Sequence, residues 1–302
     1  MKLVTASIDG QEKIAALIDE TTIVDLKAAA EERASSYIFP GTMLEAIVDG
    51  EQFIKEARET VEWVGEKTNS GFVYNIDTKD IVLRAPLPKP QKNIMCAGKN
   101  YADHAKEMGS EADIPTDPII FTKSPTTVIA ADELITPHRE VTDSVDYEGE
   151  IALIIGKKGN HIQATEAHEY IFGYTLLNDV TARDIQKRHK QFFLGKSLDT
   201  FCPMGPAVVL ADDVNIEDVT LKTWVNDELR QEASTKDLIF SVPKLIEIIS
   251  RGMTLEPGDI IATGTPAGVG AGFQPPKFLR PGDQVTIEVE QIGRLSNKVA
   301  RD

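Results

Sequence analysis

Short apolar runs of strand length, separated by turn residues, fill most of this chain from Gln91 onward. Helical patterns are fewer, and they do not alternate regularly with the strand-like runs. A doubly wound sheet requires that alternation, so the order of the runs predicts an α+β fold instead. The expected strands are residues 94–97, 119–121, 127–130, 151–155, 171–177, 207–209, 221–225, 260–262 and 284–289, and the expected helices are residues 101–108, 165–170, 181–191 and 242–250.

The N-terminal part, residues 1–85, has the pattern of a small α+β domain of its own. Asp9-Gly10 lies between its first two strand-like runs and is typical of a hairpin turn. Residues 85–90 are too rich in proline for a helix or a central strand, so we expect a domain boundary there. The larger domain would then cover residues 86–302. Within the small domain, the expected strands are residues 2–7, 13–18 and 22–26, and the expected helices are residues 43–48 and 53–64.

Acidic side chains at alternate positions mark one strand-like stretch, residues 145–155. Asp146, Glu148 and Glu150 would point to the same face, because side chains alternate along a strand. Like charges repel one another, and a bound divalent cation removes that conflict. Asp179, at the end of the next apolar run, could add an oxygen ligand. Carboxylates without His or Cys favour Mg²⁺ or Mn²⁺, and Ca²⁺ less so. The alternative is a solvent-facing edge strand whose charges block aggregation.

The 302-residue chain carries a formal net charge of −16. This charge argues against general nucleic-acid binding, which needs basic patches, and against docking on anionic membranes. The N-terminal residues lack the apolar region of a signal peptide, and no run is long enough for a membrane span. The two cysteines, Cys96 and Cys202, are then expected to be reduced thiols in the cytoplasm. An anionic substrate would need basic residues gathered at its site.

The segment that follows the acidic motif is basic. Thr181 is followed three residues later by an acid, which is the spacing of a capping box, so a helix is expected to start there. Arg183, Gln186 and Lys187 would lie in its first turns, near the carboxylates. The alternative is a charged solvent face, which we prefer for residues 188–190.

Two loops are expected close to this segment. Residues 195–206 contain several Gly and Pro, and Lys196 at their start could balance the acidic cluster. Residues 259–270 form a strand that runs into a Gly-rich loop, where backbone N–H groups and the hydroxyls of Thr263 and Thr265 could hold a carboxylate. A surface lysine and a tight hairpin are the respective alternatives. The Gly-rich loop matches neither a P-loop nor a dinucleotide fingerprint.

A histidine and a glutamate lie three residues apart in the helical pattern between Gly98 and Gly109. His104 and Glu107 would be side by side on a helix. A carboxylate beside an imidazole orients the ring, which suits a general base. A short helix between glycines could also move as a lid. The alternative is an ordinary ion pair on an exposed helix.

Taken together and in this order, the motifs resemble the fumarylacetoacetate hydrolase family. The resemblance implies a mixed β-roll fold for a catalytic domain at residues 86–302, preceded by the small α+β domain. It also implies a homodimer. The matching sequences are GKNYADH at residues 98–104, DYEGE at 146–150, GYTLLNDVTARD at 173–184, GKSLDTFCPMGP at 195–206 and TGTPAGVG at 263–270.

The resemblance also implies roles for single residues. His104 and Glu107 match a dyad that smaller family members carry on a mobile lid, here residues 99–117, and Lys196 is expected to act with them in catalysis. The implied ligands of Mg²⁺ or Mn²⁺, with Ca²⁺ as the third choice, are Glu148, Glu150 and Asp179. The expected contacts to the substrate are Lys99, Tyr101, Lys123, Arg183, Gln186 and Thr265.

Family members of this compact plan act on small anionic 2-oxo acids, and the short N-terminal segment argues against fumarylacetoacetate itself as the substrate. The expected activity is metal-dependent cleavage of a C–C bond in a 2-oxo β-dicarbonyl acid. It would proceed by acylpyruvate hydrolysis or oxaloacetate decarboxylation, through a metal-bound pyruvate enolate. Tautomerisation or isomerisation of the same substrates is the alternative within the enzymes. A non-catalytic metal-binding regulatory module is the alternative outside them.

Overall fold

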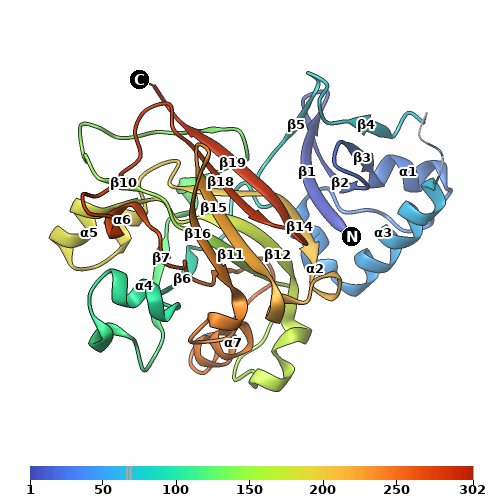
Figure 1. Cartoon of the computed structure of the whole chain (residues 1–302). Helices are drawn as coiled ribbons and strands as arrows, with labels where there is room; N and C mark the ends of the chain where they lie inside the picture. Colours follow the sequence, from blue (N-terminus) through green and yellow to red (C-terminus); the bar gives the residue numbers. More distant parts are fainter. Residues whose placement is uncertain (66, 68–69, 302) are drawn as a thin grey trace.

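The computed structural model describes residues 1–65, 67 and 70–301. A large body of strands carries a smaller N-terminal unit at one side (Figure 1). In that unit, β1 (Lys2–Ile8), β2 (Gln11–Leu17) and β3 (Thr22–Asp25) pair in antiparallel order. Asp9 and Gly10 both have positive φ angles, of 51° and 77°, so they form the hairpin turn that the sequence predicts.

Helices and two short strands complete the N-terminal unit. Thr42 and Glu45 form a full capping box at the start of α2, which explains why that helix begins there. The next helix buries Phe53 and Ala57 on the face that the sequence periodicity predicts. The elements are α1 (Leu26–Glu32), α2 (Met43–Asp49), α3 (Glu51–Val64), β4 (Val73–Asn75) and β5 (Ile81–Leu83).

One large sheet runs through both parts of the molecule, because β1 also pairs with β14 (Cys202–Leu210). Its strands follow in the order β4-β3-β2-β1-β14-β12-β11-β17-β6-β7, with β5 attached to β1 and β8 to β14. Most neighbours are antiparallel, whereas β6–β17 and β8–β14 are parallel. A domain boundary at residue 85 remains a prediction. The further strands are β6 (Ile94–Gly98), β7 (Ile119–Lys123), β8 (Val128–Ile129), β11 (Gly149–Ile155), β12 (Ile171–Asn178) and β17 (Ile260–Ala262).

A second sheet, of order β16-β15-β18-β19-β9, packs against the large one. Leu153 of the large sheet and Ile287 and Leu295 of the second sheet belong to the same buried core. The mixed α+β fold that the sequence predicts is therefore confirmed. The bounds are β9 (Leu134–Ile135), β15 (Thr220–Val225), β16 (Glu228–Ser234), β18 (Gln284–Val289) and β19 (Gly293–Val299), and β10 (Val145–Asp146) pairs separately with β13 (Thr181–Ala182).

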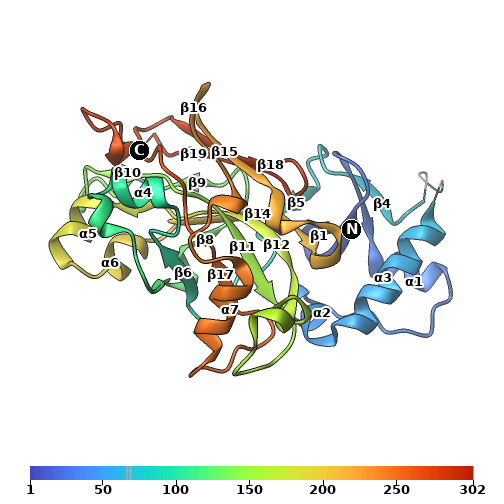
Figure 2. The same ribbon diagram turned by 60° about the horizontal axis from the view of Figure 1, so that its bottom comes forward.

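Helices α4, α5 and α6 lie together on the side of the molecule away from the N-terminal unit, as both views show (Figures 1 and 2). The α-helices of the larger part are α4 (Ala102–Glu107), α5 (Arg183–His189), α6 (Phe193–Lys196) and α7 (Val242–Ser250). Short 3₁₀ helices are η1 (Glu111–Asp113), η2 (Pro125–Thr127), η3 (Ala164–Tyr170), η4 (Ala211–Asp213), η5 (Ile216–Asp218), η6 (Thr235–Asp237) and η7 (Gly270–Gly272).

Several local expectations are wrong. The strand expected at residues 145–155 is broken after Asp146, so strand alternation does not continue into β11. The hydroxyl of Thr181 donates to the carbonyl of Asp179 at 2.8 Å and does not cap α5, which has no side-chain cap. Residues 195–206 form a loop only at 197–201, because the stretch also contains the end of α6 and the start of β14. The sequence analysis also missed β16 and β19.

The two cysteines are buried free thiols, on β6 and at the start of β14. Burial raises the pKa of Cys202 to about 12. Within the described part of the chain, every helix is too short or too polar to cross a lipid bilayer.

Candidate active site and metal centre

Three buried carboxylates meet where two neighbouring strands come together. Glu150 lies on β11, Glu148 just before it, and Asp179 directly after β12. Because β11 and β12 are antiparallel neighbours, the start of one lies beside the end of the other. The N–H of Asp179 donates to the carbonyl of Glu148 at 2.9 Å. One carboxylate oxygen of each residue lies within 4.8 Å of the others, an arrangement able to hold a metal ion.

Buried cations surround two of these carboxylates. Lys196 Nζ lies 2.7 Å from Glu148 Oε2 and 2.7 Å from Asp179 Oδ2. Lys123 Nζ lies 2.7 Å from Asp179 Oδ1, and Arg183 Nη2 lies 2.7 Å from Glu148 Oε1. Burial alone would raise the pKa of Glu148, but the charges of Lys196 and Arg183 bring that pKa down to about 2. Glu148 is therefore ionised at neutral pH.

Asp146, expected on the same face as the ligands, lies outside this group. Its Oδ2 accepts hydrogen bonds from Arg183 Nε and the N–H of Ala271, both at 2.9 Å. Its Oδ1 accepts from the N–H of Gly270 at 2.7 Å. These contacts hold Asp146 against the Gly-rich loop, which accounts for the break in the strand. Asp146 therefore supports the loop and Arg183, and the ligand group begins at Glu148.

Glu150 has no cationic partner among the residues that the structure describes. Its Oε2 accepts from the N–H of Gly264 at 2.8 Å. Burial, together with the charges of Asp179 and Glu148, raises the pKa of Glu150 well above its usual range. The buried carboxylates of the site outnumber its buried cations by one: the acids are Asp146, Glu148, Glu150 and Asp179, and the bases are Lys123, Arg183 and Lys196.

A divalent cation beside Glu150 would supply the missing positive charge. The donors are all carboxylate oxygens, which suits a hard cation such as Mg²⁺ or Mn²⁺. The residues present therefore fit the metal that the sequence motifs imply.

His104 and Glu107 face each other on α4, which lies against the Gly-rich loop. His104 Nδ1 is 3.3 Å from Glu107 Oε2, and Glu107 Oε1 accepts from the N–H of Gly268 at 2.9 Å. His104 is only 5% exposed, unlike a pair on an exposed helix. A Cβ atom at Gly272 would lie 2.1 Å from Glu107 Oε1, so the close approach of the loop depends on glycine there.

A cavity of about 560 Å³ lies between His104 of the dyad and two of the carboxylates, Glu148 and Glu150, whereas Glu107 and Asp179 are not among its lining residues. Two of the expected substrate contacts, Tyr101 and Lys123, are not among its lining residues. Tyr101 is buried and forms a β-bridge with Leu238. Lys123 is paired with Asp179. The lining includes the predicted residues Lys99, His104, Glu148, Glu150, Arg183, Gln186, Lys196 and Thr265, and further residues Met108, Phe121, Lys187, Lys190 and Phe192.

Lys190 is a lining residue that the sequence analysis placed on the solvent face. Helical spacing predicts that Lys190 lies near Gln186 and Lys187. The sequence does not indicate, however, that α5 ends at His189. Only the position of α5 beside the cavity brings Lys190 to the mouth.

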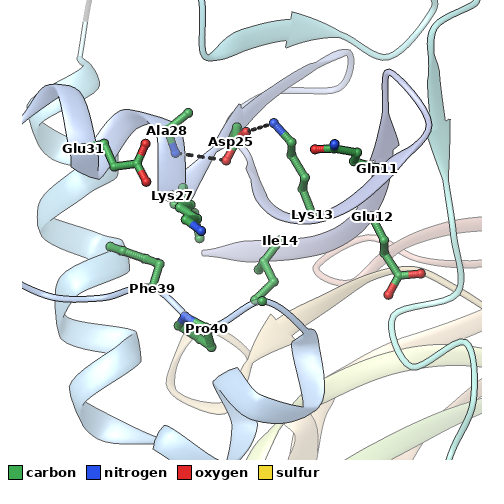
Figure 3. A pocket seen from close by; sticks show the side chains of 12 residues that line it. Gln11, Glu12, Lys13, Ile14, Asp25, Lys27, Ala28, Glu31, Phe39 and Pro40 are labelled. Atoms are coloured by element: carbon green, nitrogen blue, oxygen red, sulfur yellow. Dashed lines mark hydrogen bonds and ion pairs between the residues drawn. The ribbon is translucent and has the colours of Figure 1, made fainter.

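A second hollow, of about 340 Å³, lies in the N-terminal unit between β2 and α1 (Figure 3). Its buried carboxylate already has partners: Asp25 Oδ2 accepts from Lys13 Nζ at 2.6 Å, and Asp25 Oδ1 accepts from the N–H of Ala28 at 3.1 Å. No group of metal-type ligands lines this hollow in the described residues. The cavity beside the three carboxylates is therefore the candidate active site.

Comparisons with known proteins show the family to which the chain belongs. Residues 93–300 match the sequence model of the family described as fumarylacetoacetate (FAA) hydrolase, C-terminal. The chain is 50% identical over 302 residues to oxaloacetate tautomerase YisK of Bacillus subtilis, covering 99% of this chain and 100% of the relative.

Solved structures show the same likeness. A fumarylacetoacetate hydrolase from Exiguobacterium antarcticum matches with a TM-score of 0.83 and 39% identity, over 100% of both chains. Maleylpyruvate hydrolase from Sphingobium sp. SYK-6, solved with manganese (II) and pyruvate, matches with a TM-score of 0.76 and 29% identity, over 99% of both chains. The chain belongs to the fumarylacetoacetate hydrolase family of enzymes, as its motifs predict.

Proposed function

We propose that the protein is a metal-dependent tautomerase that interconverts the keto and enol forms of oxaloacetate. The observation that carries this proposal is the cavity itself, which is lined by His104 of the dyad and by Glu148 and Glu150 of the carboxylate group. Enolisation needs a base beside the α-carbon and positive charge beside the carbonyl oxygen, and it needs no second reactant. The Bacillus subtilis relative, 50% identical along the whole chain, bears the name of this activity. Tautomerisation, the alternative in the sequence analysis, thus takes precedence over C–C cleavage.

Glu148, Glu150 and Asp179 would hold the divalent cation, Mg²⁺ or Mn²⁺. When bound, that cation supplies Lewis acidity, which polarises the 2-oxo group of the substrate. The ammonium group of Lys196, held between Glu148 and Asp179, adds positive charge on the same side of the cavity. Negative charge that develops on the substrate oxygen is stabilised there.

His104 is the proposed base at C3 of the substrate. The imidazole takes the C3 proton, the C–H electron pair forms the C2=C3 double bond, and the π pair of the 2-oxo group moves onto its oxygen. That oxygen then takes a proton from solvent water to complete the enol. In the reverse direction His104 returns its proton to C3. Glu107 orients the ring and stabilises its charged form, and the N–H of Gly268 holds Glu107 in place.

A histidine variant tests this role. His104→Ala is expected to lower kcat for the keto–enol conversion of oxaloacetate by roughly 10²–10⁴-fold, the usual effect of removing a general base. Manganese binding, measured by calorimetry, should be retained. The matched control is His168→Ala, an exposed histidine outside the cavity, which should leave the rate unchanged. Undiminished conversion in His104→Ala would contradict the proposal.

Cleavage of an acylpyruvate is the second candidate, because one solved relative is a maleylpyruvate hydrolase. In that reaction His104 would deprotonate a water molecule, and pyruvate would be released. Measuring pyruvate alongside the keto–enol conversion separates the reactions, and it also detects decarboxylation of oxaloacetate. A tautomerase releases no enzyme-dependent pyruvate, so pyruvate formed as fast as the enol is consumed would favour cleavage.

A further inference from the structure

Two lysines at the mouth of the cavity have no acidic partner among the residues that the structure describes. Lys187 and Lys190 are exposed and line the cavity, and no carboxylate of the described residues lies within 4.0 Å of either ammonium group. Lys99, a third cation of the lining, is by contrast paired with Asp113 at 3.3 Å. In a chain of net charge −16, unpaired cations gathered at one opening form a local site for an anion.

The backbone at Lys190 adds to this observation. Lys190 ends α5 with a φ of 59°, in the left-handed region, and its N–H donates to the carbonyl of Gln186 at 3.1 Å. Glycine is the usual residue at such a helix end, because a side chain is disfavoured in this conformation. A lysine here accepts that conformation and keeps a cation at the cavity mouth.

The charges deeper in the cavity limit which anion Lys187 and Lys190 can bind. With every carboxylate ionised, the four buried acids of the site exceed its three buried bases by one charge, and Glu150 is the acid without a basic partner among the described residues. A divalent cation would turn this into one excess positive charge, which a single carboxylate of the substrate neutralises. A second carboxylate on the same substrate would find no further free cation in the interior. Among the described residues, its available partners are Lys187 and Lys190 at the mouth.

We propose that Lys187 and Lys190 form a subsite for the distal carboxylate, so that the enzyme selects dianionic 2-oxo acids over monoanionic ones. This inference rests on the proposed function, because it places the 2-oxo carboxylate at the metal end of the cavity. Phe121 and Phe192, whose ring centroids are 5.3 Å apart, line the cavity as well and provide an apolar contact for the short carbon chain.

A pair of substrates of equal length tests the subsite. Oxaloacetate and acetylpyruvate share the 2-oxo acid end, but oxaloacetate ends in a carboxylate and acetylpyruvate in an acetyl group. For the double variant Lys187→Gln/Lys190→Gln, we expect KM for oxaloacetate to rise roughly tenfold, as expected for one or two solvent-exposed charge pairs. Its kcat should change little. Kinetic constants for acetylpyruvate should stay as in the wild type.

The matched control is Arg188→Gln, which removes one positive charge from the same helix. Arg188 is exposed, lies 4.0 Å from Asp184 and does not line the cavity, so neither substrate should be affected. An unchanged KM for oxaloacetate in the double variant would overturn the proposal. An equal loss with both substrates would overturn it too, because a structural effect does not depend on the distal group.

The reaction itself can be tested separately from the subsite. Keto–enol conversion and pyruvate release are measured for both substrates, so failure of the tautomerase proposal shows in the wild type as cleavage or as no conversion. The preference for the dianion can be measured whichever reaction is catalysed. It is obtained from the dissociation constants of oxaloacetate and acetylpyruvate, each measured with the manganese-loaded wild type and with the manganese-loaded double variant. Loss of that preference in the double variant supports the subsite, and a retained preference rejects it.

Discussion

Asp146 is a buried carboxylate outside the candidate ligand group, yet several parts of the site depend on it. It accepts hydrogen bonds from Arg183 and from the backbone of Gly270 and Ala271. Arg183 in turn contacts Glu148. The negative charge of Asp146 thus compensates a buried guanidinium and fixes the loop that closes the cavity.

Asp146→Asn is expected to lower the free energy of unfolding by about 3 kcal/mol, because it leaves the buried Arg183 charge short of one partner. Urea unfolding measures this change. Asp213→Asn is the matched control: Asp213 pairs with Arg58 at 2.9 Å near the surface, and its loss should cost about 1 kcal/mol or less. Equal effects of the two substitutions would show that burial of the Asp146–Arg183 pair does not increase its contribution to the free energy of unfolding.

Glu150 has no basic partner among the described residues, and burial together with the charges of Asp179 and Glu148 raises its pKa, so the neutral acid is favoured without metal. Glu150→Gln keeps a neutral side chain of similar size, so without metal the variant should melt no lower than the wild type. Added Mn²⁺ should raise the melting temperature of the wild type, since a ligand that binds the folded state stabilises it. The variant should lose most of that increase. A full increase in Glu150→Gln would exclude Glu150 as a ligand.

At the scale of elements, the loop after β17 supplies backbone N–H groups to carboxylates of different function. Gly264 donates to Glu150 of the cluster, and Gly268 donates to Glu107 of the dyad. Both glycines have positive φ angles, of 101° and 102°. A Cβ at Gly268 would also lie only 1.8 Å from the carbonyl oxygen of Arg230. One loop therefore holds both a residue of the proposed catalytic dyad and a proposed metal ligand.

Gly268→Ala should displace this loop and reduce kcat for the keto–enol conversion by roughly 10²-fold, the effect expected when a catalytic group shifts by about 1 Å. Gly252→Ala is the control, because a Cβ at Gly252 meets nothing within 4 Å. Both variants are compared by kcat and by urea unfolding. A Gly268→Ala enzyme with wild-type kcat would show that the dyad does not need this support.

The sequence predicted which residues belong to the site better than it predicted the contacts between them. The acidic spacing from Asp146 to Glu150, with Asp179 after the next strand, indicated a carboxylate cluster, because β11 and β12 are neighbours in sequence and in space. The spacing left a charged edge strand as the alternative, and only the family resemblance implied Glu148, Glu150 and Asp179 as the ligands. The pairing of Lys123 with Asp179 joins residues 56 positions apart and has no local signal. The break at Asp146 was equally hidden, since it depends on a loop more than a hundred residues later.

At the scale of the whole molecule, the N-terminal unit and the larger part share one sheet and one core. Leu3 and Phe53 of the unit belong to the same buried cluster as Ala152 and Leu210. Removal of residues 1–85 would expose both that cluster and the edge of β14. We expect the shortened chain to aggregate, because long unpaired strand edges associate. Gel filtration of the soluble fraction tests this, and a monodisperse, folded product would favour the predicted boundary as one between independent domains.

The pairing of β1 with β14 also has a consequence for motion. Strand-to-strand hydrogen bonds replace the flexible connection about which a separate domain could swing, so the N-terminal unit has no hinge toward the cavity. We expect opening and closing around a substrate to come from the short segment that carries α4, residues 99–117. Its time scale would be that of a loop, with the rest of the enzyme as a rigid frame.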